Sequence, residues 1–160
     1  MEKRKEDLAA AQVYYDLCKM LDGEGWKYKK IVEELRIECG AQGEDLPIEL
    51  NIKVDAERQL VMLLSRLPYR IPEDKRIDIA IAVSVVNNRL VDGCVDYDIT
   101  TGNLFFRMTN SYMDSTIGGE VYKYLLYCAC QTIDSFNDRL LMLSKGMIDI
   151  AKFIELCEKE

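Results

Sequence analysis

An apolar segment between a proline and a tight hairpin constrains the fold of this chain more than any other part of its sequence. From Pro72 to Leu90 the apolar residues satisfy helical spacing, although residues 77–85 also alternate with the two-residue period of a strand. The segment is too long for a typical strand. A proline in the first turn with Glu73 and Asp74 beside it is typical of a helix start. We therefore predict a helix that is buried on most of its circumference.

A hairpin is expected directly after this helix. Residues 95–99 and 104–108 read as two short strands joined by residues 100–103. Gly102 is well placed to take the positive φ that a short turn requires, and the carboxylate of Asp98 is expected to cap the turn. We expect this hairpin to form a second, two-stranded piece of sheet.

Alternating apolar and polar residues before the helix indicate three further strands. The clearest alternation runs from Ile48 to Val54. Residues 35–39 precede it across a polar, glycine-bearing turn, and residues 60–64 follow it across a second polar turn. Trp26 and Tyr28 lie in an extended approach to the first of these strands. The pattern predicts a three-stranded meander.

Both ends of the chain show the three- and four-residue periodicity of amphipathic helices. The first helix covers Glu6 to Leu21 and is ended by Gly23-Glu24-Gly25. Its expected core-facing stripe comprises Leu8, Ala11, Tyr15 and Cys18, widened by Leu17 and Leu21. The last stripe runs from Tyr122 to Cys157, with a bend or break expected at Gly146. Such a stripe can dock on a sheet or meet its copy in a second subunit.

These elements predict an α+β fold with an antiparallel sheet and the order α-β-β-β-α-β-β-α. A chain of 160 residues is expected to form a single domain, 1–160, with a core of its own. Hydrophobic residues make up 49% of the sequence and charged residues 31%, the balance of an ordinary globular protein.

Charge and cysteine content argue against several classes of function. The net charge is −7 and no concentrated basic face is evident, so we predict no nucleic-acid partner. No uncharged run approaches the ~20 apolar residues of a membrane span, so we predict no membrane association. The N-terminal residues are charged and lack the apolar region of a signal peptide. We therefore expect a cytoplasmic protein whose six cysteines are reduced and buried.

The sequence contains no histidine. This removes Ser-His and Cys-His nucleophile pairs, histidine-ligated zinc, and the imidazole base on which many enzymes rely. We expect a protein that is not an enzyme and needs no cofactor, although a carboxylate, lysine or metal mechanism stays open.

Asp96 and Asp98 are the residues on which such a mechanism could depend. They lie two apart on one predicted strand, so both carboxylates point to the same face and could hold a divalent cation with Thr100. The calcium-loop pattern fails, because Thr101 occupies its glycine position and Arg107 its bidentate acid position. A solvated strand face is the favoured interpretation, with a small ligand- or metal-binding protein or a carboxylate enzyme as the alternative.

Three other features have structural interpretations that we favour over functional ones. Cys128 and Cys130 are two residues apart on a helix, so their sulfurs diverge by about 200° and suit buried thiols better than a metal. Gly118 and Gly119 precede a helix, where an anion could dock on free amides, but a simple helix start is favoured. Trp26 could anchor a partner, yet packing beneath the first helix is favoured.

A partner surface is suggested by four large side chains near the hairpin. Phe105, Met108, Tyr112 and Met113 could form an adaptable apolar surface for a peptide. Half of them must face the core of the sheet.

The region from Leu67 to Tyr112 carries a series of turn and packing residues: Arg70-Ile71-Pro72, Arg76, Asn88, Gly93, Asp98, Gly102 and Arg107. With these residues the region resembles the YbjN family, described as candidate bacterial sensory transduction regulators with a fold like that of type III secretion chaperones. It implies a small, non-catalytic, often dimeric protein. We predict a cytoplasmic protein-binding or regulatory module that acts as a homodimer and binds an unidentified protein partner.

Overall fold

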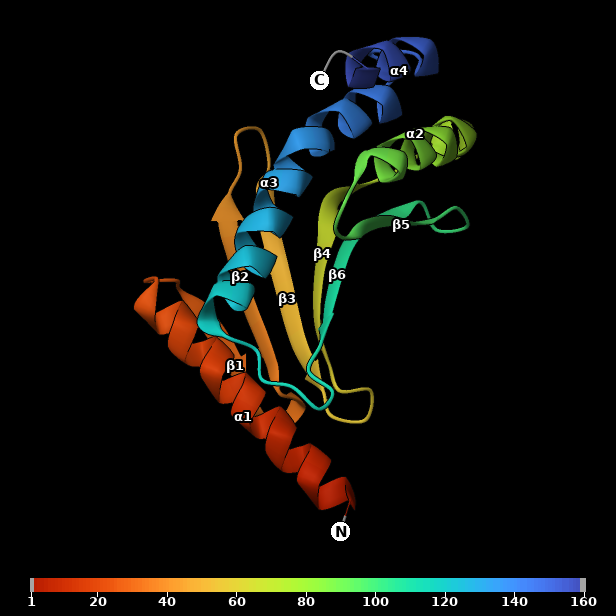
Figure 1. The fold of residues 1–160 in the computed structure, drawn as a ribbon. Coiled ribbons are helices and arrows are strands. Elements are labelled where there is room, and N and C mark those ends of the chain that lie inside the picture. Colours follow the sequence, from red (N-terminus) through yellow and green to blue (C-terminus); the bar gives the residue numbers. More distant parts are fainter. Residues whose placement is uncertain (1, 159–160) are drawn as a thin grey trace.

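A six-stranded antiparallel sheet forms the centre of the molecule in a computed structural model, which describes residues 2–158 (Figure 1). The strands are β1 (Tyr28–Ile31), β2 (Arg36–Gln42), β3 (Pro47–Asp55), β4 (Leu60–Arg70), β5 (Cys94–Asp98) and β6 (Asn103–Ser111). They lie in the order β1-β2-β3-β4-β6-β5. The helices are α1 (Glu2–Gly23), α2 (Arg76–Arg89), α3 (Gly119–Ser144) and α4 (Ile150–Glu158), with short 3₁₀ turns η1 (Val32–Glu34) and η2 (Glu73–Lys75).

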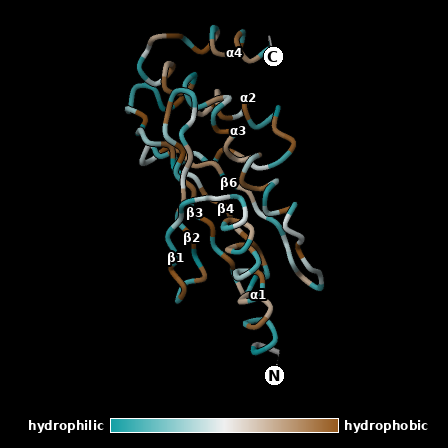
Figure 2. The backbone as a smooth tube through the Cα atoms, turned by 90° about the vertical axis from the view of Figure 1, so that its left-hand side faces the viewer, coloured by the Kyte–Doolittle hydropathy of each residue, from teal (hydrophilic) through white to brown (hydrophobic). Residues whose placement is uncertain are grey.

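Helices cover one face of this sheet. α1 and α3 pack on its middle strands, α2 packs on β5, and α4 packs on α2 (Figure 1). The chain therefore runs from α1 at one end of the molecule to α4 at the other (Figures 1 and 2). The opposite face of the sheet is open along its middle strands, where Glu49, Lys53, Arg66 and Arg107 are exposed.

The alternation in sequence decides which strand residues enter the core. All four apolar residues of β3 at alternating positions from Ile48 to Val54 are buried, as predicted. In β4, Val61, Leu63 and Leu67 are buried in the same way. Figure 2 shows this pattern as changes between brown and teal along the strands. The two-residue period of these strands therefore decides which side chains face the core.

The predicted element order is confirmed for the eight elements that it named, and the structure adds β1 and α4. The prediction of a second, separate piece of sheet is wrong. β6 pairs with β4, placing Leu63 opposite Met108 and Ser65 opposite Phe106, so the hairpin extends the meander into one sheet. The reason is that α2 leads the chain to β5 at the edge of the sheet, and β6 then returns beside β4. Both β4 and β6 present apolar residues to α3.

The helix predicted after Pro72 is confirmed, but its burial is not as predicted. Residues 77–85 are helical, and the η2 turn after Pro72 leads into α2. Only one side of α2 is buried, through Ile79, Ala82, Val83 and Val86. Ile77 and Ile81 are 66% and 44% exposed, because α2 packs on the hairpin and on α4 from one side only.

The helix predicted over Glu6 to Leu21 is confirmed, but half of its predicted core stripe is wrong. Cys18, Leu17 and Leu21 are buried, whereas Leu8, Ala11 and Tyr15 are exposed. The sequence offers two overlapping apolar stripes on this helix. The sheet selects the one that contains Ala10, Val13, Tyr14, Leu17 and Leu21.

The break expected at Gly146 is confirmed. α3 ends at Ser144, and Gly146 has a φ of +69°, a backbone conformation that glycine adopts without strain. The predicted stripe is buried from Tyr122 to Leu143, but Met147 is 67% exposed. Beyond the break, Phe153 and Cys157 hold α4 in the core. No helix within residues 2–158 is long and apolar enough to cross a membrane.

Candidate protein-binding surfaces

The corner between β4 and α2 is docked on the turn between β5 and β6. The backbone N–H of Ile71 donates to the carbonyl of Gly102 at 2.8 Å. Gly102 has a φ of +77°, the positive value that the sequence predicted, and a side chain there would clash with the carbonyl oxygen of Ile71. Close backbone approach and conformation together require glycine at this position.

Two arginines of the resemblance motif strengthen the same corner. The Nε of Arg70 donates to the carbonyl of Thr101, and Nη1 of Arg76 donates to the carbonyl of Thr100 at 2.9 Å. Because these carbonyls are consecutive, both guanidinium groups lie beside one turn. Their visible role is to fix the start of α2 on the hairpin.

Asp98 caps the turn, as predicted. Its carboxylate accepts hydrogen bonds from the backbone N–H and the hydroxyl of both Thr100 and Thr101, over distances of 2.6 to 3.3 Å. These donors hold the pKa of Asp98 well below its usual range. The carboxylate is therefore occupied by its own turn.

Gly93 lies where the chain passes from α2 to β5. Its φ is +77°, and a Cβ atom there would lie 2.5 Å from Cζ of Phe106 and 2.8 Å from Cγ of Met108. The positive φ and these close contacts explain why the motif has glycine at position 93.

The asparagine that secures this junction is Asn87, which sequence reasoning missed in favour of Asn88. The side chain of Asn87 bonds both backbone groups of Val95, whereas Asn88 is exposed. The helical phase of the buried residues Val83 and Val86 would have distinguished the two, because only residue 87 lies beside the buried side of the helix.

The second candidate carboxylate, Asp96, is paired with Arg107. Nε and Nη2 of Arg107 donate to its two oxygens at 2.6 and 3.1 Å, which lowers the pKa of Asp96. Asp96 and Asp98 thus have separate partners. Within residues 2–158 no group of three or more His, Cys, Asp or Glu side chains is placed to hold a metal ion. The arrangement favours a strand-face ion pair over a carboxylate site.

The predicted partner surface is divided by the sheet. Met108 and Tyr112 are 4% and 2% exposed and belong to the core, so their prediction as surface residues is wrong. The reason is the two-residue period of β6, which sends Met108 to the helix-covered face. Phe105 is half-buried on the open face, and Met113 is exposed beyond the end of β6. The four residues therefore do not form one surface.

The open face of the sheet nevertheless carries apolar side chains along its middle. Leu64 of β4 is diagonal to Phe105 of β6, because the register partner of Phe105 is Arg66. Met62 lies two residues further along β4, opposite Thr109. We name Met62, Leu64 and Phe105 the central apolar strip. It is partly exposed, with Leu64 at 36%.

A second exposed stripe lies on the outer side of α2. Ile77, Ile81, Ser84 and Asn88 recur at four- and three-residue steps and are all exposed. We name these four residues the α2 outer face. Next to it is an open depression of about 420 Å³, lined partly by Val85 of α2 and by Ile154 and Cys157 of α4.

The cysteines and the tryptophan show no reactive or anchoring arrangement. All six thiols are free. Burial raises the pKa of Cys39 to about 12 and that of Cys130 to about 11, so both thiols stay protonated at neutral pH. Cys128 and Cys130 are half-buried rather than fully buried. The ring of Trp26 packs edge-on against Tyr127, with 6.2 Å between centroids, in agreement with the packing interpretation.

The fold is shared with solved structures. One is described as YbjN, a candidate transcription regulator from E. coli; it superposes with a TM-score of 0.58 at 12% identity, over 81% of this chain and 90% of that chain. A chain of the ExsC-ExsE complex gives a TM-score of 0.58 at 16% identity, over 82% and 95%. A chain of the HopA1-SchA chaperone-effector complex gives 0.52 at 12% identity, over 79% and 94%.

This chain has a type III secretion chaperone-like fold. The predicted α+β class and the resemblance in fold to YbjN are confirmed. None of the three matched structures is described as an enzyme. No protein-family model matches the sequence, and no curated protein matches it.

Proposed function

We propose that residues 1–160 form a single YbjN-like domain that acts as a non-catalytic protein-binding module in the bacterial cytoplasm. The fold supports this proposal, because two of its structural neighbours are found in complexes with a protein partner, ExsE or HopA1. The proposed partner is a protein, and neither nucleic acid nor membrane. The net charge of −7 supports that choice, since phosphate-binding surfaces are basic.

The observation that carries the proposal is the α2 outer face. Ile77 is 66% exposed and Ile81 is 44% exposed, one turn apart on a helix whose other side is in the core. Adjacent exposed isoleucines leave apolar surface in contact with water in an isolated chain, and association of two chains buries that surface. The exposed isoleucines of one α2 can pack against those of a second copy. We assign the proposed homodimer to this face.

The proposed surface for the unidentified protein partner is the central apolar strip. Met62, Leu64 and Phe105 lie on the open face of the sheet, whereas α2 lies on the face that the helices cover. The ion pair between Asp96 and Arg107 borders the strip and supplies a polar rim. Met113 is exposed beyond the end of β6 and is proposed as a separate contact for the partner.

Light scattering and partner capture test the two parts separately. The homodimer requires twice the chain mass at micromolar concentration. The binding role requires that the tagged protein repeatedly recovers the same protein from extracts of its native cell, and recovery of the bare protein alone contradicts it.

A further inference from the structure

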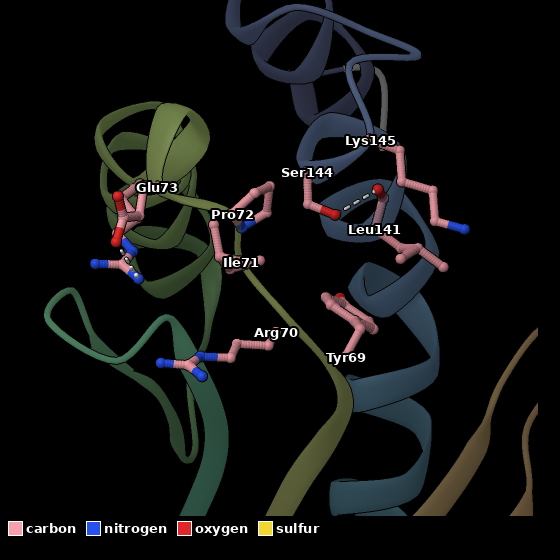
Figure 3. A pocket seen from close by; sticks show the side chains of 9 residues that line it. Tyr69, Arg70, Ile71, Pro72, Glu73, Leu141, Ser144 and Lys145 are labelled. Atoms are coloured by element: carbon pink, nitrogen blue, oxygen red, sulfur yellow. Dashed lines mark hydrogen bonds and ion pairs between the residues drawn. The ribbon is translucent and has the colours of Figure 1, made fainter.

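Three cations line one open depression at the corner between β4, α2 and α3. The depression has a volume of about 520 Å³. Its lining includes Tyr69, Arg70, Pro72, Arg76, Leu141 and Lys145. We name it the corner depression (Figure 3). It is separate from both the α2 outer face and the central apolar strip.

The two arginines of the corner depression donate hydrogen bonds to carbonyl groups. Arg70 and Arg76 donate to the carbonyls of Thr101 and Thr100. A carbonyl accepts a hydrogen bond but leaves the positive charge in place. Among the lining residues the one carboxylate is Glu73, whose Oε1 is 3.9 Å from Nη2 of Arg76. In a chain with a net charge of −7, this is a local excess of positive charge.

The guanidinium of Arg76 is incompletely satisfied. Its side chain is only 18% exposed, and its Nε is buried without a hydrogen-bond acceptor among the described residues. Glu73 is 89% exposed, so it is held loosely and can move aside. A buried donor without an acceptor is unfavourable, and a charge-assisted bond to a carboxylate is strong. The Nη2 of Arg76, which faces the exposed Glu73, is therefore suited to donate to a carboxylate that takes the place of Glu73.

Apolar groups form the rest of the corner depression. In Figure 3, Tyr69 and Leu141 lie together on the α3 side, while Ile71 and Pro72 lie on the α2 side. Tyr69 is fixed there, because its hydroxyl donates to the carbonyl of Asn137 at 2.7 Å. The guanidinium of Arg70 points toward the β5–β6 turn and the ammonium of Lys145 points the opposite way. The anionic end of a ligand is thus expected on the arginine side, with an apolar group over Tyr69.

We propose that the corner depression binds a carboxylate that stands next to an apolar side chain, presented by the protein partner. That the ligand comes from a protein partner rests on the proposed protein-binding function. The carboxylate can be the chain end of the partner or an acidic side chain within it. The planar fork of arginine matches either carboxylate, and the apolar walls bind the neighbouring side chain.

Nuclear magnetic resonance of the full-length protein tests the site with small probes. The backbone amides of residues 69–76 and the Nε–H signals of Arg70 and Arg76 are followed during titration. N-acetyl-leucine represents a chain end, and N-acetyl-Leu-Glu-amide represents an acidic side chain beside an apolar one. N-acetyl-leucinamide is the neutral control, and inorganic phosphate is the competing anion. We expect saturable shifts of both Nε–H signals with one or both carboxylate probes, and the stronger probe identifies the source.

Substitutions test whether the shifts of the NMR signals report binding of the probe at Arg70. Replacing Arg70 with glutamine (R70Q) should weaken binding about tenfold, the effect of losing one charge-assisted hydrogen bond. R66Q is the matched control, because Arg66 lies on the same strand but bonds Asn103 on the open face. If R70Q fails to fold, R70K serves instead and should weaken binding less. The proposal is overturned if neither carboxylate probe saturates, if the amide binds as well, if phosphate alone binds, or if R66Q and R70Q behave alike.

The small probes bind without a protein partner, so this result is independent of the proposed function. Light scattering on the same samples reports the homodimer separately. If the protein binds the carboxylate probes but never recovers a partner, the carboxylate site is supported and the protein-binding role is contradicted.

Discussion

The side-chain amide of Asn87 is bonded to both backbone groups of Val95. Its Oδ1 accepts from the N–H of Val95 at 2.8 Å, and its Nδ2 donates to the carbonyl at 3.0 Å. Val95 lies on β5, the edge strand of the sheet. One side chain near the end of α2 thereby satisfies both backbone groups of Val95 and fixes the helix relative to the sheet.

Replacing Asn87 with alanine should lower the free energy of unfolding by about 2 kcal/mol, because two backbone groups of the half-buried edge lose their partners. Chemical denaturation of both variants measures the difference. Gln131→Ala is the control and should change the stability by less than about 0.5 kcal/mol, since Gln131 is an exposed amide on α3, outside the α2 outer face. Equal effects of Asn87→Ala and Gln131→Ala would contradict the role given to Asn87.

Gly102 allows a close contact that no other residue can make. Gly102→Ala should destabilise the protein by more than about 2 kcal/mol, because its φ is +77° and the new methyl group meets the carbonyl of Ile71. Gly119→Ala, at the start of α3, has no atom within 4 Å of the new group and serves as the control. Thermal unfolding of both variants is the measurement. An unchanged melting temperature in Gly102→Ala would show that the corner is not closed as described.

The carboxylate of Asp98 should make the free energy of unfolding depend on pH in the acidic range. The pKa of Asp98 is lower in the folded chain than the unfolded value of about 3.9, so its contribution is fully present above that value and is lost as the pH falls below it. Asp98→Asn retains an acceptor but cannot titrate. Its free energy of unfolding should fall less steeply with acidification than that of the unaltered chain. Parallel curves for the two proteins would contradict the role of Asp98.

The central apolar strip can be tested without disturbing the core. Leu64→Gln should reduce recovery of the protein partner in affinity capture while leaving the melting temperature within the range of a surface change, because Leu64 is 36% exposed. Leu8→Gln is the matched control, since Leu8 is 66% exposed on α1, which packs on the other face of the sheet. Undiminished recovery with Leu64→Gln would place the partner on another surface.

Local patterns predicted the elements of this fold where one interpretation of the sequence was clearly better than the others. The alternation from Ile48 to Val54 admits only a half-buried strand, and Pro72 with the length of its segment decides between strand and helix. Gly102 was predicted from the demands of a short turn, and its φ of +77° agrees.

The features that the sequence did not predict depend on packing between segments that are distant along the chain. β1 has four residues, two of them lysines, so its pairing with β2 leaves no periodic signal. The union of the hairpin with the meander depends on the route of α2. The exposed stripe of α1, which includes Leu8 and Tyr15, is as periodic as the buried one. The corner depression joins residues 70 and 145, whose proximity is a property of the fold alone.

Light scattering on the unaltered chain and on Ile81→Glu at micromolar concentration tests the central claim most directly. The α2 outer face as a dimer interface predicts twice the chain mass of 18.4 kDa for the unaltered protein and 18.4 kDa for the variant. Val91→Glu, at a residue 98% exposed and outside that face, should remain dimeric. A monomeric unaltered chain, or an Ile81→Glu variant that stays dimeric, would contradict the account.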